Sequence, residues 1–352
     1  MATKLLGSLI GGAIMMTTIS ATAANAQATT GTAPLNPAAT ADRAATLLES
    51  RYVTPALGAR YAAALRSHAA RGDYATLTDP AALAARITAD LQAVATDGHL
   101  RVYHVDPTPL APPAAAPTTA TEGARSVAPG IRATRWIEPG VAYIAFEHFD
   151  DRPEAIAAFR RFLADHAGAR ALVIDSRGNH GGAFDMMGIL ANHLFATPRR
   201  LANMDMARAV VDQHGAPFPI DGQSLKRTDG PAGLVRFEHW AVPAGDRAWS
   251  TIPVYYLTSH DTFSAAEHMA MVLKSTGRAT LVGETTGGGN HFGGTEPIGP
   301  GMEMFVPVGH TTDPLTGRDW EGVGVAPDVA VPAATALDEA LRRIHASTAK
   351  TS

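Results

Sequence analysis

A strand-to-helix junction that carries a serine lies at residues 252–267, IPVYYLTSHDTFSAAE. Its apolar first half predicts a buried strand, and the residues after Ser264 predict a helix that runs to about Lys274. A second short strand is expected at Ala279–Val282, directly before the glycine-rich run GETTGGG at residues 283–289. Strand, helix and strand in this order are typical of a layered α/β core, and the junction presents Ser264 at the mouth of a helix.

Two interpretations of Ser264 follow from these residues alone. The pattern Ser264-x-x-Glu267 is a capping box, in which the serine hydroxyl satisfies free N–H groups at the start of a helix. A nucleophilic serine can occupy the same place, but its hydroxyl reacts only when a general base activates it. Other parts of the chain must therefore decide between cap and nucleophile.

A second apolar run ends in a glycine-rich loop at residues 171–182, ALVIDSRGNHGG, and a helix is expected from about Ala183. Backbone N–H groups at a helix N-terminus bind anions, and Gly181 and Gly182 have no side chain to obstruct a substrate carbonyl. The loop is therefore a candidate oxyanion hole. It has neither the spacing of a dinucleotide fingerprint nor the ending of a P-loop, and a plain strand-to-helix turn remains the main alternative.

Together the three motifs resemble the tail-specific or C-terminal processing serine protease family. The matching patterns are Asp-x-Arg-Gly-Asn-x-Gly-Gly at 175–182, Thr-x-Ser-Ala-Ala-Glu at 262–267 and Gly-Glu-Thr-Thr-Gly-Gly-Gly at 283–289, within residues 132–341. They stand in the order and spacing of the family. The resemblance is to the branch that contains the tricorn protease core and the repeats of interphotoreceptor retinoid-binding protein. It implies a ClpP/crotonase-like β-superhelix as the α/β core.

The resemblance also implies how Ser264 is activated. Members of the other branch use a Ser-Lys dyad whose Lys lies twenty-five residues after the nucleophile, where this chain has Gly289. The tricorn-like branch instead supplies a His from the segment before the core, and His99 in the run DGHL occupies its position. A neutral imidazole can accept the Ser264 proton and return it to the leaving group. His291, just beyond the glycine-rich run, is the second candidate.

A carboxylate completes the expected set. Glu321, in the run WEGVGVAPD at residues 320–328, occupies the position of the acid that orients the base in this branch. The tricorn pattern also has a Ser before its catalytic His, where this chain has Gly98, so a four-membered relay does not carry over. The expected catalytic residues are therefore Ser264, His99 and Glu321.

The same motifs imply an oxyanion hole made of backbone N–H groups, those of Ala265, Gly181 and Gly182. Acyl-enzyme chemistry requires no metal ion and no organic cofactor, and the remaining histidines show no regular metal-ligand spacing. The chain has no cysteine, which excludes a cysteine nucleophile and a disulfide framework. We therefore expect no cofactor and no metal site.

The primary hypothesis is a serine peptidase that hydrolyses peptide bonds of peptide or protein substrates through an acyl-enzyme on Ser264. The alternative is a non-catalytic carrier of hydrophobic ligands, because the retinoid-binding repeats show that this fold also serves binding. An esterase is a third possibility, although the chain lacks the Gly-x-Ser-x-Gly elbow around Ser264. A net charge of −4 spread along the chain does not indicate a nucleic-acid partner, and the sequence leaves the oligomeric state open.

Five segments are expected along the 352 residues. They are a signal peptide at 1–26, a flexible leader at 27–38, a small N-terminal helical domain at 39–105, a Pro/Ala-rich linker at 106–130 and the protease core domain at 131–349. Lys4 before an apolar stretch and the run Ala24-Asn25-Ala26 predict export to the periplasm or the cell exterior, with no membrane span after cleavage. The linker is too short to hold the PDZ domain that many processing proteases insert at this place.

Strands and helices alternate through the core. Helices are expected at about 153–166 and 334–345, and a strand at Val141–Glu147. Between residues 196 and 249, strand-like runs are expected at Ala207–Val211 and Leu234–Phe237. In relatives this region borders the substrate cleft, so it is a candidate determinant of specificity.

Overall fold

The structure is a computed structural model that describes residues 34–105, 126–218, 220–243 and 247–348. The described residues from Leu35 onward form one compact unit. The expected signal peptide, residues 27–33 of the expected leader and residues 106–125 of the expected linker lie outside the described residues. Within the described ranges, none of the helices has the length and apolar character that a membrane crossing requires.

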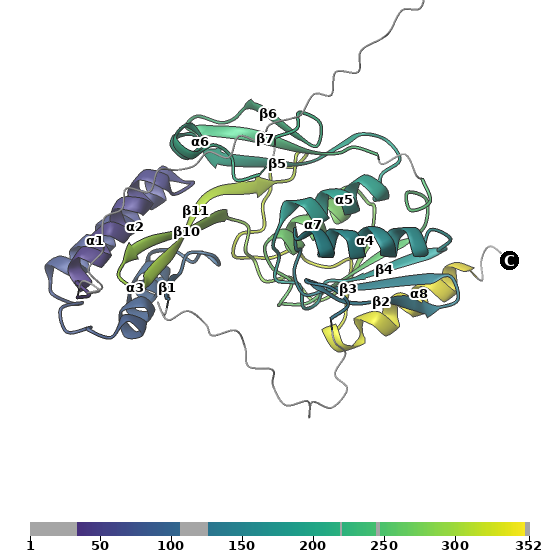
Figure 1. The fold of residues 1–352 in the computed structure, drawn as a ribbon, viewed down its shortest axis with the longest axis horizontal. Helices are drawn as coiled ribbons and strands as arrows, with labels where there is room; N and C mark the ends of the chain where they lie inside the picture. The colour runs from purple at the N-terminus through teal and green to yellow at the C-terminus, as the bar shows by residue number, and fades with distance from the viewer. Residues whose placement is uncertain (1–33, 106–125, 219, 244–246, 349–352) are drawn as a thin grey trace, which may run out of the picture. The chain divides into compact units, whose positions relative to one another are not determined.

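A six-stranded core sheet carries the expected junction (Figure 1). Its order is β12-β9-β8-β4-β3-β2, and every neighbouring pair is parallel except β2 with β3. The strands are β2 (Ile131–Glu138), β3 (Val141–Phe146), β4 (Ala171–Asp175), β8 (Val254–Thr258), β9 (Thr280–Gly283) and β12 (Val329–Ala330). Because β4 and β8 are adjacent and parallel, the loops that follow them emerge at the same edge of the sheet.

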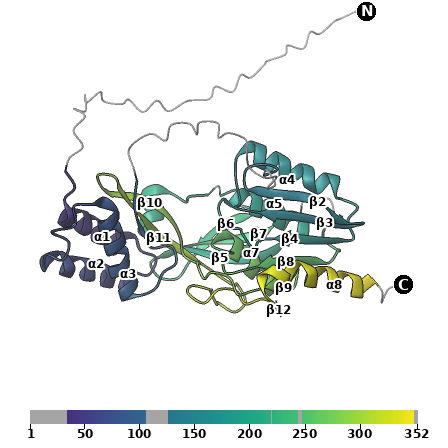
Figure 2. The same cartoon turned by 90° about the horizontal axis from the view of Figure 1, so that it is seen from below.

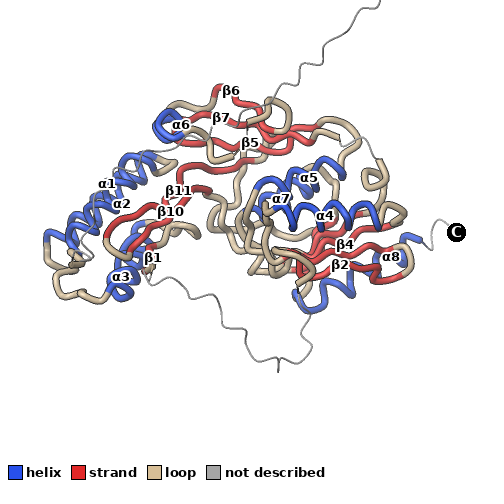
Figure 3. Tube along the Cα trace, viewed as in Figure 1, coloured by secondary structure: helices blue, strands red, loops and turns tan. Residues whose placement is uncertain are grey.

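Helices cover both faces of this sheet, as Figure 3 shows in blue. One face packs against α4 (Pro153–Asp165), α5 (Phe184–Leu194) and α7 (Ala265–Ser275), and the other face against α8 (Ala336–Thr348). A short 3-10 turn, η1 (Ala333–Thr335), precedes α8. Alternate side chains of β4 pack into the hydrophobic cores on the two faces of the sheet. Leu172 and Ile174 pack on the side of α5 and α7, and Val173 packs on the side of α8. This alternation explains why the strand reads as a continuous apolar run.

A second, antiparallel sheet shares a core with the N-terminal helices (Figure 2). Its strands are β1 (Val102–His104), β5 (Arg199–Ala207), β6 (Leu225–Asp229), β7 (Leu234–Ala241), β10 (Phe292–Gly299) and β11 (Met302–Thr312). The helices are α1 (Pro37–Arg51), α2 (Pro55–Ala70) and α3 (Pro80–Val94). Each begins with proline at its first position, where the missing N–H costs nothing, and Asn36 and Asp79 cap α1 and α3. The expected N-terminal helical segment is therefore present.

The expected strand at Ala207–Val211 is wrong. Only Ala207 belongs to a strand, β5, and the chain then forms a short helix, α6 (Arg208–His214). The β-branched residues Val210 and Val211 favour a strand by propensity, but both are buried in the core that the second sheet shares with the N-terminal helices. Tertiary packing overrides the local preference here. The strand expected at Leu234–Phe237 is confirmed as the first half of β7.

Candidate active site

Ser264 lies between β8 and α7, immediately before the helix. Its backbone has φ 56° and ψ −122°, and it is the one non-glycine residue with positive φ in the part of the chain that the structure describes. Helix caps normally have extended backbone angles, so a capping role does not explain this conformation. Strained backbone of this kind costs about 1–3 kcal/mol and clusters at functional sites. The geometry therefore favours a nucleophile over a simple cap.

The first glycine-rich loop contacts Ser264 directly. A Cβ atom at Gly181, whose φ is +95°, would lie 2.7 Å from Ser264 Cβ and 2.8 Å from Ala265 N. The Gly181 N–H donates to Asn179 Oδ1 at 3.0 Å, whereas the N–H groups of Gly182 and Ala265 have no acceptor among the described residues. Both residues line the same pocket as Ser264. Two free N–H groups beside a serine are the arrangement that an oxyanion hole requires.

Buried hydrogen bonds fasten this loop to the elements that carry Ser264. Asn179 Nδ2 donates to Ser176 Oγ at 3.1 Å, and Ser176 Oγ donates to the Tyr256 hydroxyl at 2.7 Å. Tyr256 in turn donates to the Ala266 carbonyl in the first turn of α7 at 2.9 Å. The three side chains are fully buried and paired, so the network holds the loop and the helix in one arrangement.

Glu267 is a fully buried carboxylate in the first turn of α7. It accepts hydrogen bonds from the Ser264 N–H at 2.9 Å, the Thr286 hydroxyl at 2.5 Å, and the N–H groups of Gly288 and Gly289, both at 2.7 Å. Burial raises the pKa of Glu267, while the four donors oppose that rise by stabilising the ionised form. Glu267 therefore joins the second glycine-rich run to the backbone of Ser264.

His99 follows α3 and lies between two aromatic rings. Its ring centroid is 4.7 Å from that of Phe263 and 5.2 Å from that of Phe305. Burial lowers the pKa of His99 to about 4, so its imidazole is neutral at physiological pH. Its Nδ1 is buried without a hydrogen-bond partner among the described residues. The structure thus brings His99 against the neighbour of Ser264, and the described contacts include no hydrogen bond between the imidazole and Ser264.

Glu321 binds the backbone directly before His99. One carboxylate oxygen accepts the N–H of Gly98 at 3.0 Å. The other accepts the N–H groups of Asn290 at 2.7 Å and His291 at 3.0 Å. Glu321 therefore touches the residue before His99, and its described hydrogen bonds go to backbone groups and not to the His99 imidazole.

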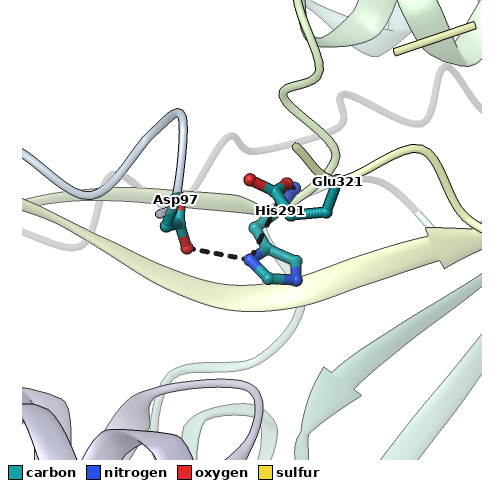
Figure 4. A group of neighbouring side chains, drawn as sticks. All are labelled: Asp97, His291 and Glu321. Atoms are coloured by element: carbon teal, nitrogen blue, oxygen red, sulfur yellow. Dashed lines mark hydrogen bonds and ion pairs between the residues drawn. The ribbon is translucent and has the colours of Figure 1, made fainter. Parts of the chain in front are cut away.

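Asp97, His291 and Glu321 form a cluster beside the backbone of Gly98 and His99 (Figure 4). Asp97 Oδ2 lies 2.8 Å from His291 Nδ1 and accepts the Tyr52 hydroxyl at 2.8 Å, while Asp97 Oδ1 accepts the His99 N–H at 2.9 Å. Burial lowers the pKa of His291, but the hydrogen bond and charge of Asp97 outweigh it and raise that pKa above its ordinary value. The pair is therefore an ion pair that ties α1, through Tyr52, to the His99 segment.

The donor atoms of this cluster lie within 4.8 Å of one another, a spacing that a metal ion can bridge. All four carboxylate oxygens of Asp97 and Glu321 already accept N–H or O–H groups. The hydrogen bonds therefore account for the cluster as an ion-pair network.

The Phe263 ring fills the space that the Lys of the other branch would need. A Cβ atom at Gly289 would lie 2.1 Å from Phe263 Cζ, and a Cβ atom at Gly98 would lie 3.0 Å from the same atom. A Ser-Lys dyad is therefore sterically excluded while Phe263 keeps this position. The same contact explains Gly98, where the tricorn pattern has Ser.

The model of peptidase family S41 matches residues 140–331, more than half of the chain. The chain belongs to peptidase family S41. A second model, the N-terminal domain of S41 peptidases in eukaryotic IRBP, matches residues 36–133. The resemblance read from the three motifs is confirmed, and the expected enzyme class, a serine-type peptidase among the hydrolases, is that of the matched family.

Similar proteins are named for C-terminal processing. A carboxyl-terminal-processing protease from Picosynechococcus sp. is 27% identical over 194 residues, which are 54% of this chain and 39% of the relative. The chloroplastic C-terminal processing peptidase from Tetradesmus obliquus is 25% identical over 198 residues, 55% of this chain and 36% of the relative. The chain thus spans less than half the length of these curated relatives.

A solved structure supports the fold. That of a candidate peptidase from Parabacteroides merdae has a TM-score of 0.54 at 16% identity and covers 85% of this chain and 90% of its own. The expected fold class, an α/β ClpP/crotonase-like core with an N-terminal helical segment, is confirmed.

In this S41 peptidase, Ser264 opens into a pocket of about 360 Å³, called here the nucleophile pocket. Its apolar walls are formed by Phe184, Met187, Met204, Phe218 and Phe292. Asp151 and Asp185, both exposed, lie among the remaining lining residues, which include no Lys or Arg. The pocket suits an uncharged apolar group and disfavours an acidic one.

His268 contributes a neutral polar group to the same pocket. It lies one turn after Ser264 on α7, and its Nε2 is 3.0 Å from Nδ1 of the buried His239. Burial lowers the pKa of His268 to about 4 and that of His239 well below its ordinary value. Both imidazoles are therefore neutral at physiological pH, so they place no charge beside the apolar walls.

Sequence reasoning missed the supporting residues of this site. The four-residue step from Ser264 to His268 is a signal that the two share a helix face. Asp97 and Tyr52 gave no such signal, because Asp97 contacts His291 across 194 residues of chain and Tyr52 contacts Asp97 across 45.

Proposed function

We propose that this S41 peptidase cleaves peptide bonds through an acyl-enzyme on Ser264. The observation that carries the proposal is the strained Ser264 backbone, which places the serine beside the free N–H groups of Gly182 and Ala265. Ser264 Oγ attacks the substrate carbonyl carbon, and the carbonyl oxygen becomes an oxyanion that these two N–H groups stabilise. Collapse of the tetrahedral intermediate breaks the C–N bond and leaves the acyl group on Ser264.

His99 is the proposed general base. It takes the Ser264 proton during attack and gives it to the leaving amine, and water then repeats the cycle to release the acyl group. Burial lowers the pKa of His99, so its imidazole is unprotonated at physiological pH and is able to accept a proton. Glu321 is a positioning residue that acts through the Gly98 N–H. His291 remains second, because its raised pKa and its bond to Asp97 favour the protonated form, which cannot accept a proton.

The substrates we propose are peptides or proteins with an apolar residue at the cleaved bond. The walls of the nucleophile pocket support this preference, and its lining includes no cation that would neutralise an acidic side chain. The names of the curated relatives support processing near a C-terminus. The sequence of residues 1–26 supports export, which intact mass of the protein recovered from the periplasm or culture medium would test.

A second candidate function is non-catalytic binding of apolar ligands in the same pocket. Two observations favour it: the match of residues 36–133 to a domain of eukaryotic IRBP, and the lack of a hydrogen bond between His99 and Ser264 among the described contacts. Catalytic hydrogen bonds are often long or absent before substrate binds, so the second observation does not exclude catalysis.

The test is covalent labelling with a fluorophosphonate probe, read by intact mass. We expect the wild-type protein and the control variant Ser250→Ala to add one probe, and Ser264→Ala to add none. The His99→Gln variant should label at a much lower rate. Absence of labelling in folded wild-type protein, together with binding of a fluorescent fatty acid, would support the carrier function instead.

A further inference from the structure

A second pocket lies beside the nucleophile pocket and is not used by the chemistry described above. It has a volume of about 260 Å³, and its walls are the apolar side chains of Met206, Val210, Val306 and Val308. They come from β5, α6 and β11, so the pocket is built by the second sheet and not by the core sheet.

The two pockets adjoin each other. Pro217 and Gly293 line both of them, and they separate the Ser264 side from the Val306 side. A Cβ atom at Gly293 would lie 2.0 Å from the Val306 carbonyl oxygen, so no larger residue fits there. On this side the boundary between the two pockets is a glycine, which has no side chain to obstruct an extended chain.

Strand β10 runs along both pockets. Phe292 lines the nucleophile pocket, and Gly294 and Glu296 line the second one. In the described residues β10 pairs only with β11. A strand with one partner has a second edge, whose backbone N–H and C=O groups can pair with a bound peptide as an added strand. Alternate side chains of such a peptide point to the same face of the sheet.

The second pocket has two charged side chains in its lining, Arg51 and Glu296, and they decide whether it can bind a charged group. Arg51 is a possible anchor for a terminal carboxylate, but its guanidinium lies 2.5 Å from the Glu296 carboxylate and is mostly buried. With this cation neutralised, His214 at the exposed end of α6 is the other polar side chain of the lining, and the remaining side chains are apolar. The pocket therefore suits an apolar side chain better than a substrate carboxyl terminus.

We propose that the second pocket is a substrate subsite, which binds a second apolar side chain of the same extended peptide whose first apolar side chain enters the nucleophile pocket. This proposal rests on the proposed function, since it assigns both pockets to one peptide substrate. The specificity of the peptidase then depends on two apolar residues and not on the residue at the cleaved bond alone.

The test measures peptide binding to the Ser264→Ala protein, so that it does not depend on catalysis. Fluorescein-labelled peptides contain one central Leu for the nucleophile pocket and a second Leu moved through the neighbouring positions of an Ala/Gly/Ser background. Fluorescence anisotropy should find one position of the second Leu that tightens binding at least tenfold relative to Ala.

Two added substitutions localise this effect. Gly294→Phe should remove the tenfold preference, because a Cβ atom there meets no atom within 4 Å and the ring can fill the second pocket. Gly168→Phe is the matched control, since this exposed glycine also has no atom within 4 Å and lies in the loop between α4 and β4. Val210→Ala enlarges the pocket and should shift the preference from Leu toward Phe.

Equal binding of all peptides, or a preference that Gly294→Phe and Val210→Ala both leave unchanged, would overturn the proposal. Urea unfolding confirms that each variant is folded. Failure of the proposed function appears separately, as absence of probe labelling on Ser264 in the wild-type protein.

Discussion

The Glu267 carboxylate accepts the Ser264 backbone N–H at 2.9 Å and thereby fixes the strained residue that we assign as nucleophile. The same carboxylate binds two N–H groups of the second glycine-rich run. A feature that resembles an ordinary capping box is thus a buried junction between two motifs of the site. Strained backbone persists only where its surroundings hold it, and Glu267 is the residue that does so most directly.

Glu267→Gln should therefore weaken both folding and reactivity. The amide keeps the size of the side chain but sets an NH₂ group against N–H donors, so we expect the free energy of unfolding to fall by about 1–3 kcal/mol. Loss of the Ser264 position should slow probe labelling by about 100-fold. Urea unfolding and labelling rates measure the two effects. Glu339→Gln, on the surface helix α8, is the control, and equal behaviour of the two variants would contradict this assignment.

Gly181→Ala should abolish probe labelling, because a Cβ atom at this position lies 2.7 Å from Ser264 Cβ. Gly277→Ala is a matched control: it also has positive φ, +66°, but a Cβ atom there meets nothing within 4 Å. We expect about 1–2 kcal/mol of destabilisation from backbone conformation alone in the control, and more than that at Gly181. Normal labelling of Gly181→Ala would refute the close packing of loop and nucleophile.

The pH dependence of labelling should report the buried environment of His99. The base acts when neutral, so the rate should rise with pH through about 4, the pKa of His99, and stay constant above it. Phe305→Ala opens one side of the imidazole to water and should move this midpoint upward, toward the ordinary value near 6.5. Circular dichroism at each pH shows whether the protein stays folded. A wild-type midpoint at or above 6.5 argues for another base.

The Asp97–His291 pair should stabilise the protein in a limited pH window. The pKa of His291 is raised, so its contribution is complete below its unfolded pKa and is lost as pH rises through the folded value. Burial tends to raise the pKa of Asp97, but its bond to His291 outweighs burial, and the pKa in the folded protein is lowered. The stabilisation that Asp97 provides is therefore lost as pH falls through this lowered pKa. His291→Gln should cost about 2 kcal/mol at pH 5.5 and less at pH 9.

Urea unfolding of the wild-type protein and the variant at both pH values measures this difference. The surface pair of His345 with Glu138 gives the control, His345→Gln, which should cost less than about 1 kcal/mol because the imidazole is 57% exposed. A cost of His291→Gln that is the same at pH 5.5 and pH 9 would show that the pair is not ionised in the folded protein.

Local patterns predicted the elements of the core sheet well. The strand before Ser264 and the helix after it are present as β8 and α7, within a residue or two of the expected ends. Such elements are predictable because their apolar periods reflect burial against neighbours that every α/β core supplies. The pattern failed at Ala207–Val211, where packing decides the conformation. It also gave no expectation for the hairpin of β10 and β11, although β10 alone, with three glycines and a proline, lacks a strand-like composition.

The sequence by itself determined the family and the two glycine-rich loops, and it singled out Ser264 as the candidate nucleophile, because these depend on residues that are close together along the chain. Only the tertiary structure decided what surrounds them. It showed that the Gly181 N–H is already bonded, that Phe263 occupies the space of a catalytic Lys, and that Glu321 contacts Gly98. The contact of Glu321 with Gly98 joins residues 223 positions apart along the chain. Contacts at that separation are set by the packing of the whole fold and not by local sequence.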